Sequence, residues 1–218
     1  MLDNQKFALE QFEELRNHLK KWTEKSNFNE GDIRYDFPNQ LDKILLYHNL
    51  NSFYFLKILS DKRTLDKIIY TPTNSDYFQL IETYQIQNKN SLIFALSGIL
   101  ENFCRVLHKK IFIENNEKKK FHQIKKEIFN FLNLEIDDKW VATSILANIR
   151  NTFHNNGIHT SQDFPSINYK EKIYQFKKNE YHYNADYDTL FNITNDIFNL
   201  YLKIIERTQV KEIEFISR

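Results

Sequence analysis

Glycine and proline are scarce in this chain, and their scarcity constrains the fold more than any other feature of the sequence. Only 3 residues of each type occur among 218. Sandwiches and barrels need many tight turns, which these two residues usually supply. The chain is therefore expected to form long helices with few connections, and it is long enough for one sizeable core.

Apolar residues recur every three or four positions through most of the chain, which predicts amphipathic helices. Helices are expected over residues 3–24 and about 40–70, with turn-forming residues making a loop of 25–38. Asn-rich stretches at 49–52 and 88–90 are expected to interrupt or kink the helices that contain them, because amide side chains compete for backbone hydrogen bonds. Pro72 is expected to end the second helical region.

Capping residues mark the later helices. Asn74 or Ser75 is expected to cap a long helix, Asp137 or Asp138 the helix that ends before Gly157, and Asp186 the last helix. Gly157 stands where a cap glycine at a helix C-terminus belongs.

Two β elements are expected near the C-terminus. Residues 167–176 and 181–183 are rich in β-formers and flank a polar turn at 177–180, which predicts a hairpin. Residues 210–216 alternate apolar and charged side chains and predict a short final strand that could join the hairpin. The fold class expected is mainly α, an antiparallel helical bundle with a small C-terminal β-hairpin or sheet.

Several side chains allow two interpretations. His48 lies on an apolar face and is expected to be a core histidine rather than a ligand. Glu101 and Arg105, four residues apart on a helix, either pair on the surface or line a site. The lysine-rich stretch 118–126 is either a solvated helix face or a surface that contacts phosphates. Gly98 costs its helix about 1 kcal/mol relative to alanine, and the expected reason is close approach of another helix.

Composition excludes some functions. A net charge of +1 does not suit binding of duplex DNA through bulk electrostatics. The single Cys104 excludes an internal disulfide and a cysteine-based zinc knuckle, and it fits a reducing cytoplasm. We expect no metal, no cofactor and no membrane contact, because the sequence has no metal-ligand spacing, nucleotide-binding glycine loop, signal peptide or membrane-length apolar run. The expected location is the cytoplasm.

The segment from Arg150 to Gly157 gathers the groups that could carry chemistry. Arg150 and His154 are four residues apart, so on a helix they share a face. An arginine can hold a phosphate through its planar fork of donors, and a histidine can exchange a proton at neutral pH. Together they could cleave RNA without a metal, with Asn151 orienting the histidine or binding a phosphate oxygen. The alternative is structural: Arg150 pairs with an acid, and His154 ends the helix.

The motif Arg-Asn-x-x-His-Asn-x-Gly at the end of a helix, in a chain of long helices, resembles the HEPN superfamily. The resemblance implies a helical domain, often a metal-independent endoribonuclease of toxin–antitoxin or antiviral systems. It also implies that two such motifs form one composite site, either across a homodimer or across two HEPN domains in one chain. RNA is then the expected substrate, a homodimer the expected assembly, and an antitoxin protein one partner that such systems can have. On this basis Arg150, Asn151 and His154 are the expected catalytic residues, and Asn155 and Asn156 the supporting, substrate-binding ones.

The resemblance covers the 139–157 helix closely, whereas the first 70 residues and residues 160–218 carry no matching signature. We expect 1–218 to form a single HEPN-like domain, with core helices at about 74–157 and 186–207 and a hairpin inserted at about 166–184. The ribonuclease motif usually has a longer gap between its arginine and histidine than the three residues found here. A catalytically inactive HEPN-like module that binds RNA, a nucleotide or a partner protein is therefore the alternative. A third interpretation is a helical scaffold that assembles through the hairpin and final strand.

Overall fold

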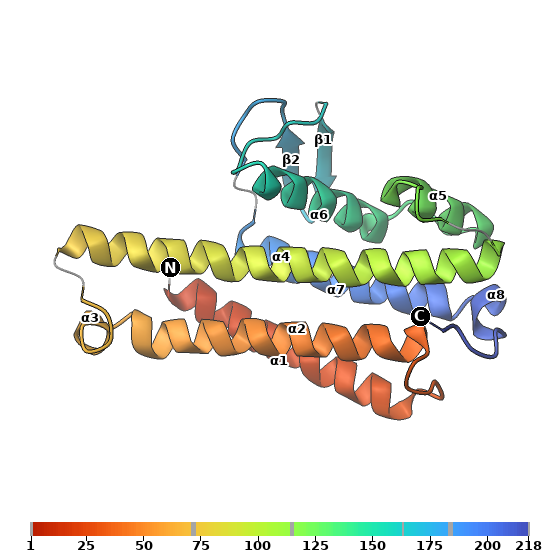
Figure 1. Cartoon of the computed structure of the whole chain (residues 1–218), viewed down its shortest axis with the longest axis horizontal. Helices are drawn as coiled ribbons and strands as arrows, with labels where there is room; N and C mark the ends of the chain where they lie inside the picture. The colour runs from red at the N-terminus through yellow and green to blue at the C-terminus, as the bar shows by residue number, and fades with distance from the viewer. Residues whose placement is uncertain (1, 71–72, 114–115, 163, 183–184, 218) are drawn as a thin grey trace.

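The structure is a computed structural model that describes residues 2–70, 73–113, 116–162, 164–182 and 185–217. It is mainly helical with one two-stranded antiparallel sheet, as expected (Figure 1). The helices are α1 (Leu2–Lys25), α2 (Ile33–Tyr54), the π-helical turn η1 (Phe55–Leu59), α3 (Lys62–Leu65), α4 (Asn74–Phe112), α5 (Phe121–Phe131), α6 (Asp138–His154), α7 (Tyr187–Ile205) and α8 (Thr208–Lys211). The strands are β1 (Phe164–Tyr169) and β2 (Lys172–Phe176).

Helix α4 runs the length of the molecule and organises the other elements (Figure 1). Helices α2 and α1 lie along one side of it, and α5, α6 and the hairpin lie on the other. Helix α7 packs against α1, α4 and α6. One hydrophobic core takes buried side chains from α1, α2, α4, α5, α6, the hairpin and α7, and a smaller cluster fills the end of the bundle around η1 and α3.

Helix α2 begins at Ile33, so the prediction of a loop through residue 38 is wrong. Asp32 caps the helix, because its side chain accepts from the backbone N–H of Arg34. Pro38 lies inside the helix and has no N–H for the carbonyl of Arg34, four residues earlier. The buried hydroxyl of Tyr201 donates to that carbonyl instead. A residue distant in sequence thus supplies the donor that proline lacks, and the carbonyl oxygen of Arg34 remains hydrogen-bonded.

The expected interruptions at 49–52 and 88–90 are also wrong, because α2 and α4 continue through both. The amides bond to other helices rather than to their own backbone. Asn49 donates to Glu13 of α1, and Asn88 donates to Ser52 of α2. Pro72 lies outside the described residues.

Helix caps are close to expectation. Asp137 and Asp186 cap α6 and α7 as predicted. Helix α4 is capped by Thr73, one residue before the predicted Asn74, and Thr73 forms a reciprocal capping box with Asp76.

The hairpin is present, but its turn is misplaced in the prediction. Lys170 and Glu171 make the turn with φ of 48° and 64°, a two-residue connection that suits the twist of paired strands. Tyr181 forms an isolated bridge with Ile158 rather than a second strand of the hairpin. Tyr183, the end of the predicted strand, lies outside the described residues.

The predicted final strand at 210–216 is wrong. The segment begins in α8 and then follows an irregular path over the start of α2. The buried Arg34 guanidinium donates to the carbonyls of Val210 and Glu214, and the N–H of Ile216 donates to Asp32. These bonds occupy backbone groups of the segment, and among the described residues its β-type pairing is limited to an isolated bridge between Ser217 and Asp32.

Within the described part of the chain, α4 is the one helix long and apolar enough to cross a membrane. Half of its most apolar window is buried inside the protein. A core helix of a water-soluble protein passes the same test.

Candidate functional site

Helix α6 places the Arg150–Gly157 segment at the edge of the bundle. Its inner face is an apolar stripe, in which Ile145, Leu146 and Ile149 are buried. Burial of that stripe against the core orients the helix, and Arg150 and His154 reach the surface beside α4.

Arg150 meets an acidic partner on α4. One guanidinium nitrogen, Nη1, lies 3.5 Å from Oε2 of Glu101, and the Arg150 side chain is 35% exposed. The inner edge of the guanidinium is inaccessible to solvent, because Nε is buried; this atom has no hydrogen-bond partner in the described chain. Arg150 therefore offers its outer nitrogens to a ligand from a half-buried position.

Glu101 is shared between two arginines. Arg105 donates from Nε and Nη2 to Oε1 of Glu101 at 2.9 and 2.7 Å. Arg105 also donates to the carbonyls of Asn116 and Lys119 in the loop before α5. The pair predicted from the spacing of Glu101 and Arg105 is therefore confirmed, and it also adjoins Arg150. Two guanidinium groups and one carboxylate leave this cluster with a net positive charge.

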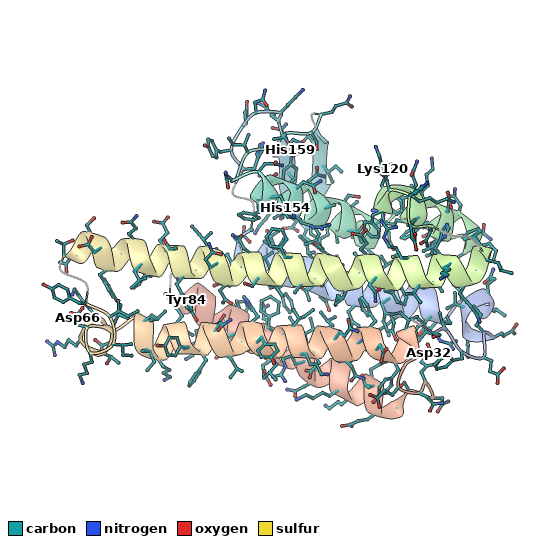
Figure 2. All side chains as sticks on the ribbon, in the orientation of Figure 1. Asp32, Asp66, Tyr84, Lys120, His154 and His159 are labelled. Atoms are coloured by element: carbon teal, nitrogen blue, oxygen red, sulfur yellow. The ribbon has the colours of Figure 1, made fainter. Side chains whose placement is uncertain are left out.

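His154 lies one turn beyond Arg150 on α6. It is exposed, and its ring packs edge-on against Phe94 of α4 with centroids 4.8 Å apart. Figure 2 shows His154 at the end of α6, on the same side of α4 as Lys120. Phe94 with His154 and Glu101 with Arg150 make two antiparallel contacts between α4 and α6.

Gly98 lies between those two contacts on α4. The prediction that another helix approaches closely at Gly98 is wrong. An added Cβ would meet no atom of the described residues within 4 Å, so no helix among them packs against this position. Positions 94, 98 and 101 follow helical spacing along one stripe. Gly98 is therefore an exposed position between the two contacts, with open space where a side chain would lie. We call this space the Gly98 notch.

The amides after His154 mostly terminate the helix. The N–H groups of Asn156 and Gly157 donate to the carbonyls of Phe153 and Thr152, which is the Schellman pattern. Asn156 has φ of 55° and holds the left-handed position that the prediction assigned to Gly157, while Gly157 follows with φ of 87°. The cap is thus one residue earlier than expected.

Asn155 is committed to the same cap. Its amide donates to the carbonyl of Asn151 and to the hydroxyl of Thr160. Asn151 itself is exposed one residue from Arg150. Of the five residues expected in the site, Arg150, Asn151 and His154 share an accessible region, whereas Asn155 and Asn156 shape the end of α6.

The lysine-rich segment is only partly a solvated face. Lys125 is buried, with Nζ 2.5 Å from the Thr143 hydroxyl and 3.8 Å from the centre of the Trp140 ring. Burial lowers the pKa of Lys125 from 10.5 to about 8. Lys120 and Lys126 are exposed, and Arg105 ties the lysine-rich loop to the Glu101 cluster. The spacing of residues in the sequence did not identify Lys125 as buried, because the side chains that contact its ammonium group, Thr143 and Trp140, belong to α6.

His159, the next histidine after the motif, is not part of this surface. It is fully buried, with its ring 5.6 Å from the ring of Phe176 on β2 and Nε2 3.1 Å from the carbonyl oxygen of Gln162. Among the described residues no group of three or more His, Cys, Asp and Glu side chains is placed to hold a metal ion.

Comparisons of the chain with protein-family models, curated proteins and solved structures find no match.

Proposed function

We propose that this chain is a HEPN-like cytoplasmic protein that cuts single-stranded RNA without a metal ion, in a toxin–antitoxin or antiviral defence system. The observation that carries the proposal is the position of Arg150 and His154. They lie on adjacent turns of α6 and both reach solvent beside α4. Arg105 ties the loop before α5, which carries the exposed Lys120, to the same region through the backbone carbonyl of Lys119, and these positive charges suit a polyanionic substrate.

The reaction proposed is attack of a ribose 2′-oxygen on the adjacent phosphorus, with cleavage of the bond to the 5′-oxygen. His154 removes the 2′-hydroxyl proton or protonates the leaving 5′-oxygen. Arg150 stabilises the extra negative charge on the phosphoryl oxygens. In a homodimer the second copy supplies the complementary histidine and a second arginine. Asn151 binds a phosphate oxygen, and Asn155 and Asn156 hold the end of α6.

A non-catalytic HEPN-like module is the second candidate. It would bind RNA, a nucleotide or a partner protein, such as an antitoxin, through the same surface. Two observations favour it: Glu101 already offsets part of the Arg150 charge, and only three residues separate Arg150 from His154. The scaffold interpretation is weakened, because the final strand on which it partly depended is absent from the described chain.

Cleavage of single-stranded RNA in EDTA tests the first candidate. Wild type is expected to cut, and Arg150→Ala and His154→Ala to cut at least about a hundredfold more slowly, since a general acid or base typically contributes that much. Arg63→Ala and His18→Ala are matched controls, because both residues are exposed and lie on α3 and α1, and His18 packs edge-on against a phenylalanine as His154 does. The controls should cut like wild type.

Binding of the same RNA distinguishes the two candidates. If wild type leaves varied RNAs intact, or if both site variants still cut, the catalytic proposal fails. Binding without cleavage that Arg150→Ala weakens and Arg63→Ala does not would support the non-catalytic module. Absence of both binding and cleavage would contradict RNA as the ligand.

A further inference from the structure

Glu101 lies between two arginines, and it does not bind them equally. Arg105 donates to Oε1 of Glu101 from two nitrogens, at 2.9 and 2.7 Å. Arg150 approaches the other oxygen, Oε2, with Nη1 alone and at 3.5 Å, which is longer than the about 2.9 Å of an ordinary N–H···O hydrogen bond. The carboxylate is therefore bound mainly by Arg105, and its contact with Arg150 is the weaker of the two.

Arg105 holds Glu101 from a fixed position. Each nitrogen of its guanidinium group already donates within the chain, because Nη1 also bonds the carbonyl of Asn116 at 3.0 Å and Nη2 that of Lys119 at 3.2 Å. The buried Asn116 side chain donates back to the Arg105 carbonyl at 2.7 Å. Arg105 is thus occupied by the protein, and Arg150 is the arginine that a ligand can engage.

The contact between Arg150 and Glu101 is one that a phosphate can replace. The Arg150 side chain is 35% exposed and that of Glu101 26%, and an ion pair that solvent reaches is weak. A phosphate presents two oxygens to the planar fork of a guanidinium group, which makes a stronger contact than one long approach to a carboxylate. The displaced carboxylate keeps its bonds to Arg105, so displacement leaves no charge without a partner.

Glu101 continues to act after it is displaced. Because Arg105 keeps the carboxylate beside Arg150, its negative charge repels the bound phosphate. The same charge lowers the affinity of the site for phosphate and favours release of a phosphorylated product.

We propose that Glu101 is an internal competitor for Arg150 that a phosphoryl group displaces, and that Arg105 is the positioning residue that holds the displaced carboxylate. This rests on the proposed function only in taking a phosphoryl group as the ligand of Arg150. The contact between α4 and α6 is then autoinhibitory, and its strength sets the affinity of Arg150 for its ligand.

Titration with inorganic phosphate at low ionic strength, followed by the NMR shift of the Arg150 Nε–H group, tests the competition. Nε is buried, so its proton is expected to exchange with water slowly enough to be observed. Wild type should show a saturable shift. Glu101→Gln should bind phosphate about fivefold more tightly, because the amide keeps the shape of the carboxylate without its charge. Glu82→Gln makes the same change at an exposed position of α4 and should bind like wild type.

Arg105→Lys tests the positioning role. Lysine keeps the positive charge but lacks the fork that binds Oε1, so Glu101 is freer to pair with Arg150 and phosphate should bind about threefold more weakly. In the Glu101→Gln background the same change should leave phosphate binding unaltered. An Arg105 that bound phosphate directly, or that only supported the fold, would weaken binding equally in both backgrounds.

Three results would overturn the competition: no saturable shift in wild type, binding by Glu101→Gln no tighter than by Glu82→Gln, or an equal effect of Arg105→Lys with and without Glu101. A thermal melt of each variant identifies any loss of binding that comes from unfolding. A wild type that shows this competition for phosphate but does not cut RNA would contradict the ribonuclease proposal alone.

Discussion

At the scale of single residues, Gly98 lacks a side chain at a place where its helix would gain from one. Glycine inside a helix costs about 1 kcal/mol relative to alanine because its unfolded backbone is freer. No packed neighbour requires it, since the space around its Cβ position is open. Gly98 lies between the Phe94 and Glu101 contacts. In the proposed function, the space left by the missing side chain would admit RNA or a second copy of the chain.

Gly98→Ala should raise the free energy of unfolding by about 1 kcal/mol, because the helix gains propensity without a clash. Urea unfolding measures the change. Gly31→Ala is the control: Gly31 has φ of +88°, so the added methyl group should lower stability instead. A loss of stability in Gly98→Ala would show that the site is more crowded than the structure has it.

At the scale of elements, α2 depends on a hydrogen bond from α7. Pro38 removes one bond from the helix, and the Tyr201 hydroxyl supplies a donor for the freed carbonyl of Arg34. The start of α2 is thus stable only when α7 is packed against it. The C-terminal segment also binds the start of α2: Arg34 donates to the carbonyl of Val210, and the N–H of Ile216 donates to Asp32.

Tyr201→Phe should lower the free energy of unfolding by about 1–3 kcal/mol, because it leaves the Arg34 carbonyl buried and unsatisfied. In a Pro38→Ala background the cost should fall below about 1 kcal/mol, since the alanine N–H can reach that carbonyl. Urea unfolding of the four proteins measures this coupling.

Tyr174→Phe is the control for that cycle. Its hydroxyl pairs with Thr189, far from Pro38 in the sequence, so its removal should cost the same in both backgrounds. If Tyr201→Phe also costs the same with and without Pro38, the hydroxyl does not replace the missing N–H.

At the scale of the whole molecule, one chain supplies only one Arg150 and one His154. The proposed reaction needs an acid and a base on opposite sides of the phosphate, which two copies can provide when their α4–α6 surfaces face each other. The Gly98 notch lies in the middle of that surface.

Light scattering at tens of micromolar should give a mass twice that of the 26.5-kDa chain. Gly98→Trp should shift the protein toward the monomer, because the notch would be filled. Gln87→Trp adds the same ring to an exposed position elsewhere on α4 and should leave the mass unchanged. A wild-type monomer at this concentration would leave the composite site without its second half.

The sequence by itself determined the features that depend on neighbouring residues. Apolar spacing identified α1, and apolar spacing with capping aspartates identified α6 and α7, because a helix's inner face and its first turn are local properties. The same locality placed Arg150 and His154 on one face and Glu101 beside Arg105.

Only the tertiary structure decided what depends on distant partners. Helix α2 continues past Pro38 because of Tyr201, and α4 continues past Asn88 because Ser52 takes its amide. The final segment is not a strand because Arg34 binds its carbonyls. In the candidate site, the approach of α4 to α6 sets Glu101 against Arg150. The physical reason is the same throughout: a polar group finds its partner only after helices that are far apart in the chain have packed together.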